Sequence, residues 1–157
     1  MPFDPCKIGN KKSESQKENI MYQDTNKNMA DLAVKKISYL KNNFRGFFIS
    51  SMMAGAYVGV GIILILTLGN DVAPENINLV MGCFFGIALT LIIFAGAELF
   101  SGHTMIMSFG FLYKKIKFFE VIYDWFVCWY GNLMGAVLIS ILFILGGGGG
   151  WVEESSS

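Results

Sequence analysis

The sequence contains few charged residues for its length. Aspartate, glutamate, lysine and arginine make up 15% of its 157 residues, whereas a soluble domain usually carries about 25%. Between Phe47 and Tyr113 only three charged residues occur, namely Asp71, Glu75 and Glu98. Segments so poor in charge are tolerated where lipid surrounds the chain. The scarcity of charge therefore argues against an ordinary soluble domain and predicts a membrane protein that has the lipid bilayer as a partner.

Cysteine and histidine are also scarce. The three cysteines, Cys6, Cys83 and Cys128, are widely spaced, and His103 is the only histidine. This pattern argues against a disulfide framework or a metal site, and we interpret Cys83 and Cys128 as buried small hydrophobic residues. The net charge is zero, which gives no reason to expect nucleic acid as a partner. Because no nucleophile–base pair, metal cluster or phosphate loop is recognisable, we predict neither an enzyme nor a cofactor.

Three long apolar segments predict an all-α membrane protein. Residues 47–68 contain no charge over 22 residues, and residues 125–145 none over 21, close to the ~20 residues that span a bilayer. The segment 76–113 has 38 residues and only one charge, Glu98. A straight helix of that length would measure about 57 Å, against a hydrocarbon core of about 30 Å. The second span must therefore break. We predict a transmembrane region over 45–145, with spans at about 47–68, 77–112 (broken near 98–104) and 121–145.

The basic residues predict the orientation of these spans. Nine of the twelve lysines and arginines precede the first span, and the other three, Lys114, Lys115 and Lys117, follow the second. Basic residues are retained on the cytoplasmic side of a membrane. We therefore expect a multi-pass protein of the cell membrane whose N-terminus is cytoplasmic.

The segments at the two ends differ from the spans. Residues 1–27 are polar and predict a disordered cytoplasmic N-terminus. Residues 28–44 place apolar residues at helical spacing with lysines between them, which predicts an amphipathic helix at the membrane interface or a solvated juxtamembrane helix. Residues 146–157 form a Gly/Ser-rich tail that we interpret as a truncated or non-native end.

Each predicted span contains two glycines four residues apart. Such pairs make a flat stripe that allows helices to approach closely in lipid. We expect the following glycines to pack helices against each other: Gly55, Gly59, Gly82, Gly86, Gly131 and Gly135.

The polar stretch from Glu98 to Thr104 is the predicted functional site. A helix break survives within a membrane where it is buried in protein or lines a water-filled path. Half-helices that meet at such a break direct partial positive charge into the membrane, which favours a passing anion. Ser101 and Thr104 supply hydroxyl donors, and we expect Gly102 to form the tight turn.

Single residues near the break each allow two interpretations. Glu98 is either a structural carboxylate that accepts hydrogen bonds from the backbone amides of its own loop, which we favour, or a titrating group on a proton or cation path. His103 is either a hydrogen-bonding support, which we favour, or a gate. Phe85 and Leu89, one helical turn apart, are core or lipid-facing residues or form a hydrophobic constriction, and their spacing alone favours the core.

The motif AGAELFSGHTM at residues 95–105 and the motif CWYGNLMGA at residues 128–136 resemble the formate/nitrite transporter family, and its nitrite branch in particular. The resemblance implies half of an aquaporin-like fold of six helices in two inverted repeats, assembled as a homopentamer. It implies a pore-lining omega-type loop at Leu99, Phe100 and Ser101, and a cytoplasmic hydrophobic slit at Phe85 and Leu89 in place of the core. The implied substrates are small monovalent anions (formate, nitrite or hydrosulfide), moved by a channel or a proton-coupled carrier.

The resemblance also implies a second half that follows the third span and contains its own broken helix and a pore histidine. This chain instead continues from its third span into five glycines at 146–150 and then WVEESSS. His103 does not match the motif position of that pore histidine. We therefore expect the 157-residue chain alone not to enclose a pore. The alternative function is a non-transporting, truncated membrane protein or an assembly partner of a full-length relative.

Overall fold

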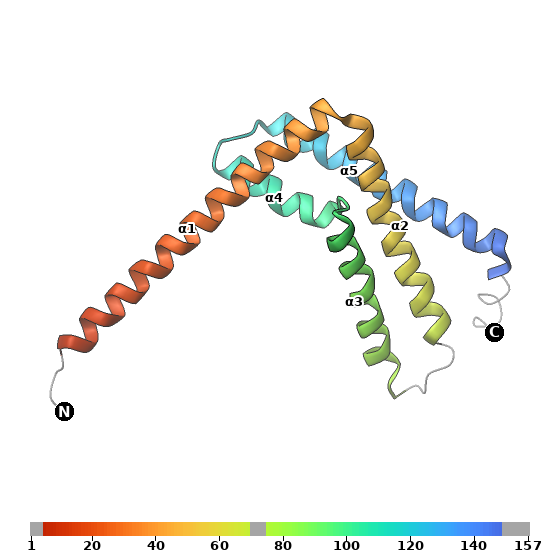
Figure 1. Ribbon diagram of the computed structural model, residues 1–157, viewed down its shortest axis with the longest axis horizontal. Coiled ribbons are helices and arrows are strands. Elements are labelled where there is room, and N and C mark those ends of the chain that lie inside the picture. The colour runs from red at the N-terminus through yellow and green to blue at the C-terminus, as the bar shows by residue number, and fades with distance from the viewer. Residues whose placement is uncertain (1–4, 70–74, 149–157) are drawn as a thin grey trace.

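The computed structural model describes residues 5–69 and 75–148, and these residues are largely helical (Figure 1). The helices are α1 (Pro5–Asn42), α2 (Phe44–Gly69), α3 (Ile77–Ala95), α4 (Phe100–Leu112) and α5 (Phe118–Phe143), followed by a π-helical turn at Ile144–Gly148.

Three segments are long and apolar enough to cross a membrane, namely Phe44–Thr67, Ile77–Ala95 and Phe118–Gly148. The presence of three candidate spans agrees with the prediction, but the second one ends at Ala95, whereas the predicted span continued beyond its break to residue 112. The second apolar segment is divided, because α3 ends at Ala95 and α4 begins at Phe100.

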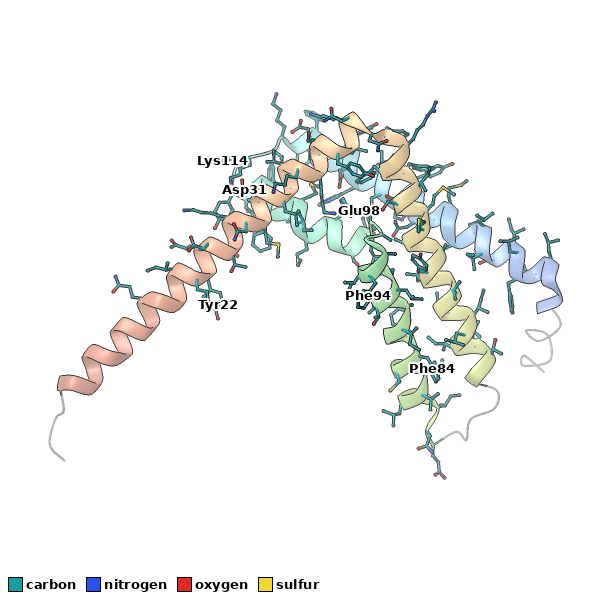
Figure 2. The ribbon with its side chains drawn as sticks, viewed as in Figure 1. Tyr22, Asp31, Phe84, Phe94, Glu98 and Lys114 are labelled. Carbon is teal, nitrogen blue, oxygen red and sulfur yellow. The ribbon has the colours of Figure 1, made fainter. Side chains whose placement is uncertain are left out.

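The helices meet at the top of the view in Figure 1, and from there α1 projects to one side and α5 to the other. Helices α2 and α3 run side by side, and α5 packs along α2 and then leaves in a different direction. At the break α4 turns away from α3 and lies beside α1. Glu98 is labelled at this junction in Figure 2, whereas Tyr22 lies on the part of α1 that projects away from the other helices. Side chains of α1, α2 and α5 contact the break.

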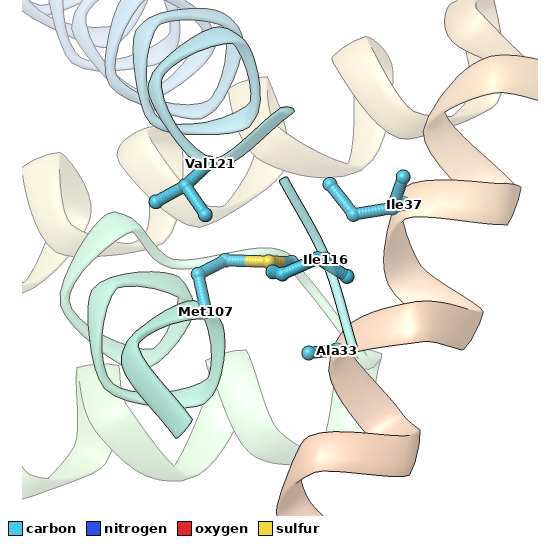
Figure 3. Close-up of a cluster of buried hydrophobic side chains, with 5 residues drawn as sticks. All are labelled: Ala33, Ile37, Met107, Ile116 and Val121. Carbon is cyan, nitrogen blue, oxygen red and sulfur yellow. The ribbon is translucent and has the colours of Figure 1, made fainter. Parts of the chain in front are cut away.

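The largest buried apolar cluster joins α1 to α4 and α5 (Figure 3). Its members are Ala33, Ile37, Met107, Ile116 and Val121. A second cluster contains Leu40, Phe47, Val127 and Cys128. The apolar stripe predicted within residues 28–44 is therefore buried against protein rather than lipid along Ala33, Ile37 and Leu40.

The N-terminal segment differs from its predicted division. One helix runs from Pro5 to Asn42, where we expected disorder over 1–27 and a helix over 28–44; residues 1–4 lie outside the described residues. The low hydrophobicity of the N-terminal segment predicts that it does not pack against other helices, and Tyr22 is indeed exposed. Helix formation needs only local hydrogen bonds, and the many Lys, Glu, Gln and Met residues here are good helix formers.

Four of the six predicted packing glycines lie where α2 and α5 touch. A Cβ atom on Gly55 would lie 1.9 Å from the Asn132 carbonyl oxygen, and one on Gly135 would lie 1.9 Å from the Met52 carbonyl oxygen. Gly59 faces Ile139 and Gly131 faces Ser51 in the same contact. These helices approach so closely that no side chain fits between their backbones.

The glycine pair of α3 has no such partner. A Cβ atom on Gly82 or Gly86 would meet no atom within 4 Å in the described part of the chain. Cys83 between them is exposed, so the prediction of a buried Cys83 is wrong, whereas Cys128 is buried. This face of α3 is uncovered in the single chain. Of the predicted tail, Gly146–Gly148 belong to the π-helical turn, and residues 149–157 lie outside the described residues.

Candidate functional site

Gly96 makes the turn that breaks the second span. Its φ angle of 63° lies in the left-handed region, where only a residue without Cβ is unstrained. The N–H groups of Gly96 and Ala97 bond back to the carbonyl groups of Ile93 and Ile92, which closes the end of α3. The break therefore covers residues 96–99 rather than 98–104. The prediction that Gly102 forms the turn is wrong, because Gly102 lies within α4.

Asn132 of α5 connects the break to two neighbouring helices. Its Oδ1 accepts a bond of 3.1 Å from the Phe100 N–H, and its Nδ2 donates to the Glu98 and Ser51 carbonyl oxygens at 3.0 Å each. The Phe100 N–H belongs to the first turn of α4, so it has no partner inside its own helix. Asn132 thus satisfies polar backbone groups that lipid could not. Our sequence analysis missed this role, although an amide side chain in an apolar span was a usable signal.

Further contacts satisfy other polar groups of the broken backbone. The Glu98 N–H donates to the Ser50 carbonyl oxygen at 3.2 Å, and Cys128 Sγ donates to the Glu98 carbonyl oxygen at 3.3 Å. The Ser50 hydroxyl donates to the Gly96 carbonyl oxygen at 3.3 Å. An irregular segment is tolerated at membrane depth only when protein supplies such partners. Helices α2 and α5 supply them here.

Four ionisable side chains form a continuous chain beside the break. Lys36 of α1 forms an ion pair with Glu98, and Glu98 Oε2 lies 2.8 Å from His103 Nε2. On the other side of the ring, His103 Nδ1 lies 2.9 Å from Asp124 Oδ2. His103 is 1% exposed and Asp124 0%. The partners predicted for the Glu98 carboxylate, its own loop amides, are wrong; they are Lys36 and His103.

An open cavity of about 420 Å³ lies against this chain of charges. Lys36, Glu98 and His103 contribute to its wall together with the apolar residues Leu89 and Leu99. The first turn of α4 contributes Ser101 and Gly102. The cavity therefore combines charged groups, apolar side chains and the N-terminus of a short helix.

Three of the predicted site residues do not line this cavity. Phe85 lies in α3 one turn before Leu89, farther from the break, and is partly exposed. Phe100 packs against the apolar cluster of Leu40 and Phe47. The Thr104 hydroxyl donates to the Ser101 carbonyl oxygen at 2.7 Å, so its hydrogen is already used within α4.

The chain is similar to known proteins over most of its length. The sequence model of the family described as "Formate/nitrite transporter" matches residues 23–155. The chain belongs to this family. This membership and the three long apolar helices indicate a membrane protein, and the family is the one that the motifs at the break resemble.

The formate/nitrite transporter relatives include bacterial and archaeal proteins. The nitrite transporter NirC of Escherichia coli is 48% identical over 131 residues, which cover 82% of this chain and 48% of that protein. The formate channel BtFdhC of Bacillus thuringiensis is 30% identical over 118 residues, 72% of this chain and 44% of that protein. A probable formate transporter of Methanothermobacter thermautotrophicus is 35% identical over 95 residues, 57% of this chain and 35% of that protein.

A solved structure agrees with the sequence comparison. A protein described as an "FNT family ion channel" superposes with a TM-score of 0.76 at 48% identity, covering 80% of this chain and 51% of that one. The fold is therefore that of a formate/nitrite transporter over the matched part. The chain spans about half the length of the curated relatives it matches.

Proposed function

We propose that this chain supplies one half of a membrane pathway for small monovalent anions, with nitrite, formate and hydrosulfide as the substrate class. The pathway acts as a channel or as a proton-coupled carrier and passes through the cavity at the break between α3 and α4. Relatives named as a nitrite transporter and a formate channel support this class of substrate.

The observation that carries the proposal is that α4 begins at the cavity wall. Leu99 precedes the helix, and Ser101 and Gly102 of its first turn line the cavity. N–H groups in a first turn lack partners in the helix, and the helix dipole adds partial positive charge at the same end. Both features favour an anion over a cation within the membrane.

The apolar part of the wall fits a constriction. Leu89 and Leu99 line the cavity, and Phe85 lies one turn from Leu89 along α3. Helix α3 leads from the connection near residue 75 to the break, whereas the basic loop with Lys114 follows α4. If basic residues mark the cytoplasmic side, Phe85 and Leu89 belong to the outer half of the path. This placement replaces the cytoplasmic slit that the family resemblance implied.

The uncovered face of α3 supports a pathway that further protein completes. Ile93 and Phe94 are 77% and 87% exposed, and Figure 2 labels Phe94 near the break. The open positions at Gly82 and Gly86 lie on the same helix. We propose that a second half, as in the longer relatives, covers this face and that the completed units assemble as a homo-oligomer, a pentamer by resemblance.

The proposal is tested by nitrite uptake into cells that lack their own formate/nitrite transporters. Residues 1–145 are joined to the part of the E. coli nitrite transporter that follows its matched segment. We expect this chimera to restore uptake and the 157-residue chain alone to leave it at the level of the empty vector. A chimera that reaches the membrane in normal amount without restoring uptake would favour the non-transporting alternative.

A further inference from the structure

The charge of His103 decides what the cavity presents to an anion. A bare Glu98 carboxylate in the wall would repel a nitrite or formate ion. Lys36 offsets that charge, which leaves the wall neutral if His103 is neutral and singly positive if His103 is a cation. Asp124 does not line the cavity, so its negative charge lies behind the ring.

The contacts of the imidazole ring determine where its protons lie. Nδ1 is 2.9 Å from Asp124 Oδ2 and Nε2 is 2.8 Å from Glu98 Oε2. Two acceptors cannot approach so closely without a hydrogen between them, so each contact needs one proton. At each contact that proton belongs to the ring or to the carboxyl group. Because Lys36 forms an ion pair with the same Glu98 oxygen, the anionic carboxylate is favoured and the proton stays on the ring.

The surroundings of the ring contain one group that opposes a positive charge. Lys36 Nζ lies 3.4 Å from His103 Nε2 and repels an imidazolium. Phe47 of α2 packs at 89° to the ring with centroids 5.3 Å apart and carries no charge. Two carboxyl groups at hydrogen-bond distance thus favour a positive charge on the ring, and one ammonium group opposes it. Asp124 is fully buried, and its Oδ1 has no partner among the described residues, so the carboxyl group is held by the His103 contact at Oδ2.

We propose that Asp124 is a positioning residue that keeps His103 doubly protonated, so that the cavity wall of Lys36, His103 and Glu98 carries one net positive charge. Its role in transport rests on the proposed function, but the protonation state itself does not. An anion then passes a wall that attracts it although a carboxylate is part of it. The charge is held in place by a buried carboxylate that the anion never contacts.

The test uses the full 157-residue chain in lipid nanodiscs with ¹⁵N-labelled histidine. Because His103 is the only histidine, every ring signal in the ¹⁵N spectrum reports this one side chain, provided that the purification tag contains none. At pH 7 we expect two protonated ring nitrogens in the native chain. We expect Asp124→Asn to lose one of the two N–H signals and Asp124→Glu to keep both. The matched control Asp31→Asn, which removes an exposed partner of Lys115, should leave the spectrum unchanged.

A neutral ring in the native chain at pH 7 would overturn the proposal, as would two N–H signals that persist in Asp124→Asn. If that variant does not fold, the native spectrum and the Asp124→Glu spectrum still decide the matter. The outcome is independent of the chimera experiment. A doubly protonated ring in a chain whose chimera carries no nitrite would refute the proposed function and leave the assignment of His103 intact.

Discussion

The Oδ1 atom of Asn132 accepts a hydrogen bond from the Phe100 N–H, so a side chain of α5 caps the helix that begins at the break. The same amide group donates to the Glu98 and Ser51 carbonyl oxygens. One side chain of α5 therefore joins α2, the break and α4. The first turn of α4 keeps its position at the cavity because of this contact.

We predict that Asn132→Ala destabilises the protein by about 1–3 kcal/mol, because it leaves a buried backbone N–H and a carbonyl oxygen without their partner. Asn42→Ala is the control, since Asn42 is exposed and its side chain bonds only to Ser38 among the described residues. Unfolding by a denaturing detergent in mixed micelles measures both. Equal stability of the two variants would show that Asn132 does not hold the break.

Alanine is predicted to have opposite effects at Gly135, in the contact between α2 and α5, and at Gly86, on the uncovered face of α3. Gly135→Ala places a methyl group where the Met52 carbonyl oxygen lies, and we expect a loss of about 1–3 kcal/mol from this overpacking. Gly86→Ala meets open space, and we expect no loss, because alanine is the better helix former by roughly 0.5–1 kcal/mol. The same detergent titration compares them. A larger loss for Gly86→Ala in the single chain would contradict the structure.

Lys36 is predicted to affect transport far more than its neighbour. Lys36→Gln removes the cation that offsets Glu98 at the cavity, and we expect nitrite flux through the chimera to fall about tenfold, which corresponds to ~1.4 kcal/mol. Lys35→Gln removes an exposed charge and should change flux by less than about twofold, as expected for a screened surface charge. Equal flux in both variants would show that the Lys36–Glu98 pair does not affect the passage of the anion.

The orientation predicts which loop is accessible from outside the cell. In a variant without native cysteines, a cysteine at Glu75 should react with a membrane-impermeant maleimide in intact cells. A cysteine at Lys114 should react only in inverted vesicles, because the basic loop is expected to be cytoplasmic. Both positions are exposed, so burial does not obscure the result. The reverse labelling pattern would show that the topology is the opposite of the predicted one.

The spans were predictable because length and hydrophobicity are local properties of the sequence. The existence of the break followed from the same arithmetic, since 38 nearly uncharged residues exceed one bilayer crossing. The position of the break did not follow from that arithmetic, because both Gly96 and Gly102 are able to turn the chain. The structure selects Gly96 through its left-handed φ angle, which composition does not reveal.

The partners of the site residues were not predictable from spacing. Lys36 and Glu98 are 62 positions apart, and His103 and Asp124 are 21 apart on different helices. A helical pattern shows which residues share one face of a helix, but it does not show which other helix that face contacts. Asp124 therefore escaped notice although it is a carboxylate in an apolar span, which is a usual sign of a functional or paired group in a membrane.

The most direct test of the central claim is nitrite flux into liposomes that contain the purified chimera of residues 1–145 with the second half of the E. coli nitrite transporter. We expect flux well above that of empty liposomes, a strong decrease in the Lys36→Gln variant, and no flux above empty liposomes for the 157-residue chain alone. A correctly inserted chimera whose nitrite flux equals that of empty liposomes would contradict the claim that the break in this chain forms half of an anion pathway.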